Sequence, residues 1–387
     1  MKIGIITFHF AENYGAVLQC YALQQYFANL ECPVEIINYR PDYHTVEYAA
    51  FLSPYKRFKK DLYKNREYKG SDKMKRIVKG QLLNLRDLFY RDKIRKKRQA
   101  FLDFEAQYLK ETREYKTLEE IQRNPPECDA YISGSDQLWN PKLTNDQLDR
   151  AYFLDFGDLA VKRLTYAVSA CQLDVNKYRK QLKKLLSNLD GISLREDRKR
   201  ADLSKIYDGD IVCNIDPTLL HKKELYDEIR TKEKQETDYL LLLLFSKESQ
   251  RKLNKVLAGI TAELQVKPLI FHPTVSRMKW DVPVITPVGV GPSEYISYIA
   301  NAKYIITDSF HCTAFSIIYK KEFITLPLKG RGERMIELLS GLQLEDRIAN
   351  TEEDLLKLIH RKLDYSRTDE LLEAAKEKTD HYFKKYL

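Results

Sequence analysis

The chain has 387 residues, and since single hydrophobic cores stop growing at about 250–300 residues, we expect two domains. Hydrophobic residues make up 43% and charged residues 31% of the chain, and this balance excludes a disordered or fibrous protein. The formal net charge of +9 is concentrated between residues 56 and 110, where 19 Lys and Arg stand against 7 Asp and Glu.

The N-terminal half alternates strand-like and helix-like patterns. Residues 2–8 form a β-type run, residues 15–30 have apolar side chains at helical spacing, and residues 34–39 form a second apolar run. This βαβ order implies parallel strands joined by a right-handed crossover. Further strand-like runs lie at 130–133, 164–169, 191–194 and 211–215. We therefore expect an α/β domain over residues 1–231.

A basic segment interrupts this domain at about residues 48–120. Its apolar residues fall partly at helical spacing, which predicts a helical insertion. Tyrosines lie among its charges, but the sequence contains no recognised nucleic-acid-binding module, so we expect no nucleic acid partner. Residues 56–110 instead suit peripheral contact with anionic lipid at the inner face of the cytoplasmic membrane, or with a diphosphate-linked substrate there. A solvated helical face is the alternative.

A polar stretch at residues 232–237 predicts a hinge, after which the alternation restarts. Pro292 and Glu294 mark the start of one helix. The remaining patterns predict strands at 239–245, 268–271, 303–307 and 322–326 and helices at 248–263 and 309–319. We expect a second α/β domain over residues 238–365 and a C-terminal helix over residues 366–387.

The cysteines and the apolar runs indicate a compartment. Six scattered cysteines form no CxxC pair and no metal-ligand spacing, so we expect small core residues and no metal site. No window approaches the ~18 consecutive apolar residues that a membrane-spanning helix needs. His9, Glu12 and Asn13 interrupt the first apolar run before a signal-peptide core is complete. These patterns predict a cytoplasmic protein.

Polar residues that follow strands are the first candidates for a site, because open parallel sheets bind ligands beyond the carboxyl ends of their strands. The strand at 303–307 ends in Asp308 and Ser309, and either could cap the next helix. His311 is not needed for capping, and its imidazole would face the strand ends. We therefore expect a functional role for His311, with a core histidine as the alternative.

Two polar segments follow strands of the N-terminal half. Gly15, in Asn-Tyr-Gly, is either a turn residue or a point where a ligand approaches the backbone, and one glycine does not make a dinucleotide-binding fingerprint. The segment GSDQLWNP, residues 134–141, combines a tryptophan with hydrogen-bonding side chains, which suits a sugar. In the alternative, Trp139 belongs to the core and Asp136 caps the loop.

Two arginines are candidate anion ligands. Arg195 ends an otherwise apolar strand, where a planar and permanently charged guanidinium suits a carboxylate or phosphate. Pairing with Glu196 is the alternative for this residue. Arg334 precedes an amphipathic helix and is the weaker candidate, because most such charges are solvated.

Several segments together resemble the polysaccharide pyruvyl transferase family. They are KIGIITFHFAENYGAVLQCYAL with INYRP near the N-terminus, then ISGSDQLWNP, ISLRE and IDPTLL, and finally IITDSFHCTAFSIIY, RMIELL and LEDR. The motifs GSDQ-x-WN and DSFH in this order are fairly specific as a pair. The resemblance extends from residue 2 to about residue 347 and omits the basic insertion and the C-terminal tail.

The resemblance implies an α/β fold of two facing Rossmann-like domains, similar to GT-B glycosyltransferases, with the acceptor on the N-terminal side and the donor on the C-terminal side. It implies transfer of the enolpyruvyl group of phosphoenolpyruvate to two hydroxyls of a glycan sugar, giving a cyclic pyruvate ketal. The expected acceptor is a hexose such as galactose in a lipid-linked or polymeric precursor of a surface polysaccharide. No cofactor and no metal are implied.

The resemblance also assigns residues. Those expected at phosphoenolpyruvate are Arg195, Ser309, Phe310, His311 and Arg334. Many members have arginine at the position of Ser309 and glycine at that of Cys312, so one expected cation is missing here. Arg334, Arg331 and the helix N-terminus are the candidates to replace it. The residues expected at the acceptor are Asn13, Tyr14, Gly15, Gln137, Trp139 and Asn140.

The chemistry requires a proton donor and a general base. We expect His311 to protonate the methylene carbon of the donor or to steady its phosphate. Asp136 is the first candidate for the base, and Asp308 is the second. The rival hypotheses are a nucleotide-sugar-dependent glycosyltransferase of the same architecture and a catalytically silent glycan-binding protein.

Overall fold

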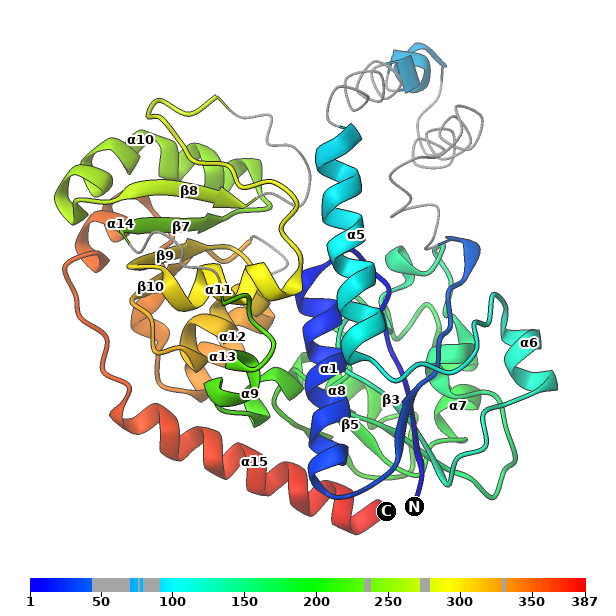
Figure 1. Cartoon of the computed structure of the whole chain (residues 1–387). Helices are drawn as coiled ribbons and strands as arrows, with labels where there is room; N and C mark the ends of the chain where they lie inside the picture. Colours follow the sequence, from blue (N-terminus) through cyan, green and yellow to red (C-terminus); the bar gives the residue numbers. More distant parts are fainter. Residues whose placement is uncertain (44–69, 76, 79–90, 233–237, 272–278, 329–331) are drawn as a thin grey trace.

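A computed structural model of the chain contains two α/β domains that pack against each other (Figure 1). Residues 48–69, 76 and 79–90 of the predicted insertion, residues 233–237 of the predicted hinge, and Arg331 lie outside the described residues. The structure describes residues 1–43, 70–75, 77–78, 91–232, 238–271, 279–328 and 332–387.

The sheet of the N-terminal domain has the strand order β2-β1-β3-β4, with every pair parallel. The parallel bridges Leu164–Gly191 and Val168–Leu194 continue it into the parallel pair β5-β6. The strands are β1 (Ile3–Ile6), β2 (Val34–Ile36), β3 (Ala130–Ser133), β4 (Lys162–Thr165), β5 (Ile192–Leu194) and β6 (Ile211–Cys213). Strands β1, β3 and β5 are fully buried, as expected of a parallel sheet that has both faces covered.

The sheet of the C-terminal domain has the strand order β10-β9-β7-β8 and is also parallel. Its strands are β7 (Tyr239–Leu243), β8 (Lys267–Phe271), β9 (Tyr304–Thr307) and β10 (Phe323–Thr325). All five residues of β7 are buried, which explains its uninterrupted apolar run. The two parallel sheets confirm the predicted α/β class.

The helices begin where strands end, and polar residues cap several of them. Asn13 accepts from the backbone of Gly15, Ser246 from that of Glu248, and Ser309 from that of Cys312. The helices are α1 (Tyr14–Asn29), α5 (Arg91–Tyr108), α6 (Leu118–Arg123), α7 (Arg179–Leu186), α8 (Arg200–Leu203), α9 (Lys223–Asp227), α10 (Lys247–Leu264), α11 (Pro292–Asn301), α12 (Phe310–Ile318), α13 (Glu333–Gly341), α14 (Glu352–Leu358) and α15 (Ser366–Tyr386).

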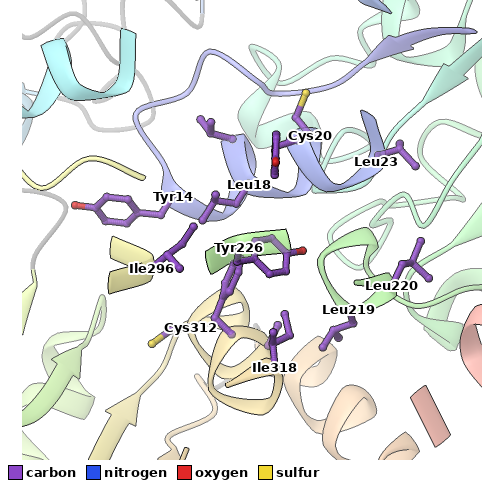
Figure 2. Packing of buried hydrophobic residues seen from close by; sticks show 14 of the residues in the cluster. Tyr14, Leu18, Cys20, Leu23, Leu219, Leu220, Tyr226, Ile296, Cys312 and Ile318 are labelled. Carbon is purple, nitrogen blue, oxygen red and sulfur yellow. The ribbon is translucent and has the colours of Figure 1, made fainter. Parts of the chain in front are cut away.

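A continuous apolar cluster joins the two domains. Figure 2 shows Leu18 of α1 in the same cluster as Ile296 of α11 and Cys312 of α12. The ring of Tyr14 stacks on Tyr295 with 4.4 Å between centroids, and its hydroxyl donates to the Val290 carbonyl at 3.1 Å. A large apolar contact of this kind fixes the relative position of two domains.

Helix α5, the longest described helix of the predicted insertion, packs against both domains. Its Ala100 lies against Gly291 at the start of α11, where an added Cβ would be only 2.6 Å from the Ala100 Cβ. Its Glu105 is buried and accepts from Arg40 at 2.8 Å, and Arg40 also pairs with Glu111 at 3.1 Å. The insertion is therefore anchored to the N-terminal domain by an ion pair and to the C-terminal domain by close packing.

Helix α15 leaves the C-terminal domain and ends under the N-terminal one (Figure 1). At its start, the Tyr365 hydroxyl donates to the Lys321 carbonyl at 2.7 Å. Near its end, Phe383 packs against Phe27 and Tyr166, with ring centroids at 4.8 and 5.0 Å. The Tyr382 hydroxyl donates to the Thr165 carbonyl at 2.8 Å. The C-terminal helix is thus a second connection between the domains.

The Glu105 carboxyl makes stability depend on pH. Burial raises its pKa from 4.5 to about 7, although Arg40 acts in the opposite direction. Because the folded pKa is the higher one, Glu105 favours folding most below about pH 4.5, and this contribution is lost as the pH rises through about 7. Relative to Glu105→Gln, the wild type should lose about 3 kcal/mol of unfolding free energy over this window, measured by urea denaturation. Asp103→Asn, on the exposed side of α5, is the control, and a difference that does not change with pH would contradict the assignment.

Candidate active site

The carboxyl ends of the strands bring polar residues of both domains together. Ser135 and Asp136 follow β3, Arg195 follows β5 and Asp216 follows β6 in the N-terminal domain. His311 lies in the first turn of α12, after β9 of the C-terminal domain. These residues lie close together because the carboxyl ends of the strands in a parallel sheet lie along the same edge of that sheet.

The Asp216 carboxylate lies at the centre of this group. Its Oδ2 accepts from Arg195 Nη1 at 2.8 Å and from the Ser135 hydroxyl at 2.9 Å, and it lies 3.5 Å from His311 Nε2. Its Oδ1 accepts from the backbone N–H and the hydroxyl of Thr218 at 3.1 and 2.7 Å. One buried carboxylate therefore contacts the arginine of one domain and the histidine of the other.

The electrostatics of Asp216 follow from these partners. Its side chain has no exposure to solvent, and burial alone would raise its pKa. His311, Arg195 and Thr218 have the opposite effect, and they hold the pKa of Asp216 well below its ordinary value. The side chain is therefore a carboxylate at neutral pH, and it lies at ion-pair distance from His311 Nε2.

The Arg195 guanidinium is buried, with its side chain only 2% exposed. Besides Asp216, it has two carboxyl groups nearby, with Asp136 Oδ1 at 3.9 Å from Nη2 and Glu196 Oε2 at 3.9 Å from Nε. Burial opposes the charge, but these acids raise the pKa of Arg195. Its Nε and Nη2 have no hydrogen-bond partner, so two buried N–H directions are open to a ligand oxygen.

The His311 ring lies against Gly15 of the other domain. A Cβ built on Gly15 would be 2.0 Å from His311 Nδ1 and 2.2 Å from its Cγ, so no side chain fits at this position. Glycine is therefore required at position 15 because the imidazole occupies the space of a side chain, and not because the backbone has a positive φ. His311 Nε2 is buried and has no hydrogen bond, since its 3.5 Å contact with Asp216 is an ion-pair distance only.

Two arginine side chains and the His311 ring lie around the Phe310 ring. The Arg195 guanidinium carbon lies 4.5 Å from its centroid, and that of Arg334 on α13 lies 5.9 Å away. The His311 ring meets it edge to face at 5.1 Å. Both arginine distances are within the range of cation–π attraction. The structure thus brings the predicted donor residues Arg195, Phe310, His311 and Arg334 together.

Ser309 and Asp308 have structural partners. The Ser309 hydroxyl caps α12, accepting from the Cys312 N–H at 3.4 Å. The Asp308 carboxyl accepts from the backbone N–H groups of Phe245 and Ser246 at 2.7 and 2.8 Å. Burial raises the pKa of Asp308 to about 6, and these hydrogen bonds lower it in part. Asp308 therefore holds the turn between β7 and α10.

The loop expected to stack on a sugar is packed instead. Trp139 has no exposed surface, stacks on Phe153 at 4.8 Å and donates to the Tyr152 carbonyl at 3.4 Å. This corrects the expectation of a sugar on its ring, because the ring is fully buried against Phe153 and the indole N–H already has a partner. Asn140 caps a short turn through Lys142 and donates to Gln137 at 3.2 Å.

The residues predicted at the acceptor in the N-terminal turn differ in their surroundings. Tyr14 lies in the domain interface, where Tyr295 and Val290 engage its ring and hydroxyl, and this corrects its assignment to the acceptor. Asn13 caps α1 and remains exposed.

Asp136, the first candidate for the general base, adopts a left-handed backbone with φ of 81°. Its carboxyl accepts from the Gln137 N–H at 2.8 Å, and its Oδ1 lies 3.9 Å from Arg195 Nη2.

Sequence reasoning missed Asp216 and assigned Glu196 only as a pairing partner. Glu196 accepts from the Ser169 hydroxyl at 2.9 Å and the Ala170 N–H at 2.7 Å. The sequence did indicate Asp216, because this aspartate directly follows a predicted strand, as Arg195 does. An Asp before Pro also reads as a helix cap, and Asp216 does accept from Thr218 in this way.

Two absences hold for the residues that the structure describes. Among those residues, no group of three or more His, Cys, Asp or Glu side chains is placed to hold a metal ion. None of the helices there is both long and apolar enough to cross a membrane.

Comparison with known proteins gives a family and a fold. The family model described as polysaccharide pyruvyl transferase matches residues 13–329. The UDP-N-acetylglucosamine 2-epimerase of Rickettsia bellii superposes with a TM-score of 0.53 at 11% identity, covering 100% of this chain and 96% of that one. The glycosyltransferase SnogD of Streptomyces nogalater gives a TM-score of 0.44 at 10% identity, covering 99% and 95%. No curated protein sequence shows significant similarity to this chain.

The structural likeness supports the fold alone at such low identity. The epimerase has the GT-B architecture of two facing Rossmann-like domains, and its likeness confirms the fold class that the sequence predicted.

The contact between Gly15 and His311 can be tested by a double-mutant cycle. Gly15→Ala should destabilise the wild type, because its Cβ would overlap the imidazole. In the His311→Ala background the same change should be harmless, since alanine is the better helix former. We expect a coupling free energy of about 1–3 kcal/mol from urea unfolding of the four proteins. Additive effects would show that the ring does not lie on Gly15.

Proposed function

The chain belongs to the polysaccharide pyruvyl transferase family, and from this premise we propose that it moves the enolpyruvyl group of phosphoenolpyruvate onto two hydroxyls of a glycan sugar. The product is a cyclic pyruvate ketal, and phosphate is released. The observation that carries the proposal is a set of buried side-chain nitrogen atoms without hydrogen-bond partners at the domain junction, namely Nε and Nη2 of Arg195, Nε2 of His311 and Nε of Arg334.

The charge of the donor suits this set. Phosphoenolpyruvate carries a carboxylate and a phosphate, and both need hydrogen-bond donors in a site from which water is excluded. Buried N–H groups without partners are costly, and the oxygens of a small anion would satisfy them. The N-terminus of α12 adds its partial positive charge at the same place.

We assign the proton transfers to residues on the two sides of the junction. His311, paired with Asp216, delivers a proton to the methylene carbon, which becomes a methyl group, while one sugar hydroxyl adds to the central carbon. The proton of that hydroxyl passes to a general base. Asp136 is our candidate for the base, because Asp308 is occupied by the turn between β7 and α10.

The second step closes the ketal. The second hydroxyl attacks the central carbon, the bond from that carbon to the phosphate oxygen breaks, and phosphate leaves with the electron pair. The proton of the second hydroxyl goes to the solvent or to the phosphate. Arg195 and His311 would stabilise the charge on the departing group.

We assign the acceptor to the N-terminal domain and α5. We propose a hexose such as galactose in a lipid-linked precursor, handled at the inner face of the cytoplasmic membrane. The first half of α5 exposes Lys93, Arg95, Lys96 and Arg98. A basic helix of this kind favours anionic lipid or diphosphate at its surface. Asn13, exposed at the start of α1, remains a candidate acceptor contact.

The release of inorganic phosphate tests the proposed function. The wild type, given phosphoenolpyruvate and a lipid-linked galactose acceptor, should release phosphate, and mass spectrometry should find the acceptor heavier by one pyruvic acid less water. His311→Ala should lower the rate by about 100-fold or more, because a general acid contributes that much. His360→Ala, an exposed histidine of the same domain, is the control.

Two results would refute the proposal. Thermal stabilisation by a UDP-sugar and not by phosphoenolpyruvate would favour the glycosyltransferase. Binding of the glycan without any phosphate release, equal in wild type and His311→Ala, would favour a silent glycan-binding protein.

A further inference from the structure

Formation of the ketal removes a proton from each of two sugar hydroxyls, and Asp136 can take only the first of them. The second proton ends in the solvent or on the phosphate, but a base must contact the hydroxyl to remove it. A second carboxyl group lies at the same strand edge. Glu196 directly follows Arg195 after β5, and it is only 2% exposed.

The two carboxyl oxygens of Glu196 have different surroundings. Oε1 accepts from the Ser169 hydroxyl at 2.9 Å and from the Ala170 N–H at 2.7 Å. Oε2 is buried and has no hydrogen-bond partner among the described residues. A buried carboxylate oxygen without a donor is costly. Oε1 therefore holds the segment that follows β4, whereas Oε2 is available to a ligand.

The arginine nitrogen nearest to Oε2 also lacks a partner. Arg195 Nε is buried without a hydrogen bond to any described residue, and it lies 3.9 Å from Glu196 Oε2, which is longer than a hydrogen bond. A hydroxyl group both donates and accepts, so one hydroxyl between these two atoms would satisfy both. A donor phosphate or carboxylate oxygen could accept from Nε, but Glu196 would repel it. The gap therefore favours a hydroxyl.

Asp136 repeats this arrangement on the neighbouring nitrogen. Its Oδ1 lies 3.9 Å from Arg195 Nη2, which is likewise buried without a partner in the described part of the chain. Parallel bridges from Val168 to Asp136 and to Leu194 hold the two acid-bearing segments side by side. Two acids along one edge of a guanidinium match two neighbouring sugar hydroxyls. Nη2 carries two N–H groups, so one remains for an oxygen of the donor.

Both acids also lie near the second arginine of the site. Burial and then the neighbouring Arg195 lower the pKa of Arg334. Cys171, Glu196 and Asp136 act on that pKa in the opposite direction. The two carboxyl groups are therefore within electrostatic reach of both guanidinium groups, and the gaps beside them adjoin the cations proposed to hold the donor.

We infer that Glu196 is the general base for the second hydroxyl of the acceptor, and this inference rests on the proposed function. In the ring-closing step, Glu196 Oε2 takes the proton of the hydroxyl while the hydroxyl oxygen bonds to the central carbon. The bond from that carbon to the phosphate oxygen breaks, and phosphate leaves with the electron pair. Glu196 then passes the proton to the solvent, and Asp136 serves the first hydroxyl in the same way.

The experiment separates the two additions. In the full chain, Glu196→Gln keeps an oxygen for Ser169 and Ala170 and replaces Oε2 by an amide. With phosphoenolpyruvate and a lipid-linked galactose acceptor, its phosphate release should fall about 100-fold or more, because a general base contributes that much. The first addition should continue, so mass spectrometry after a base quench should find the acceptor heavier by one intact phosphoenolpyruvic acid. Asp136→Asn should give neither this adduct nor phosphate.

A matched control and two further readouts exclude a structural role. Asp197→Asn removes the exposed acid of the next residue and should release phosphate like the wild type. Glu196→Gln should unfold at the wild-type temperature, because the contacts of Oε1 are kept. Its kcat should fall while its KM for phosphoenolpyruvate changes little, since Glu196 acts after the donor has bound. A clearly lower unfolding temperature would assign the loss to structure and overturn the inference.

The remaining outcomes are distinguishable. Phosphate release at the wild-type rate by Glu196→Gln overturns the inference, leaves the function standing and indicates that the gap holds only water. Slow release without any adduct shows that Glu196 acts before the ring closes, and this also overturns the inference. A wild type that forms no ketal overturns the proposed function itself.

Discussion

A single buried carboxylate, that of Asp216, sets the geometry of the domain junction. A carboxylate with no solvent exposure is stable only with cations and hydrogen-bond donors around it. Here those partners come from two domains: Arg195 and Ser135 from one, and His311 from the other. The site is therefore complete only when the domains are together, and separating them would remove His311 and leave Asp216 with Arg195, Ser135 and Thr218.

The apolar interface and the site depend on each other through α1. Residues on one side of this helix pack into the interdomain cluster, and its second residue, Gly15, meets the His311 ring. The stacked pair Tyr14 and Tyr295 lies beside that contact. A movement of α1 that disturbs the packing would also displace the imidazole. The same few residues thus hold the domains together and keep the catalytic candidate in place.

The parallel sheets could be predicted from sequence because buried parallel strands leave an unmistakable record of continuous apolar runs. The rule that ligands lie at strand carboxyl ends then found Arg195 and His311, which do converge. It failed for Trp139, because the residues that cover an indole, such as Phe153, are known only once the loop has folded back. It missed Asp216 for a related reason, since whether an aspartate caps a turn or bridges two domains depends on distant residues.

Helix α15 has a mechanical consequence. It contacts the C-terminal domain through Tyr365 and the N-terminal domain through Phe383, so it is attached to both domains (Figure 1). A helix that is attached to both domains resists their sliding and separation. The aromatic contacts of Phe383 near the end of α15 therefore help to keep the two halves of the candidate site together.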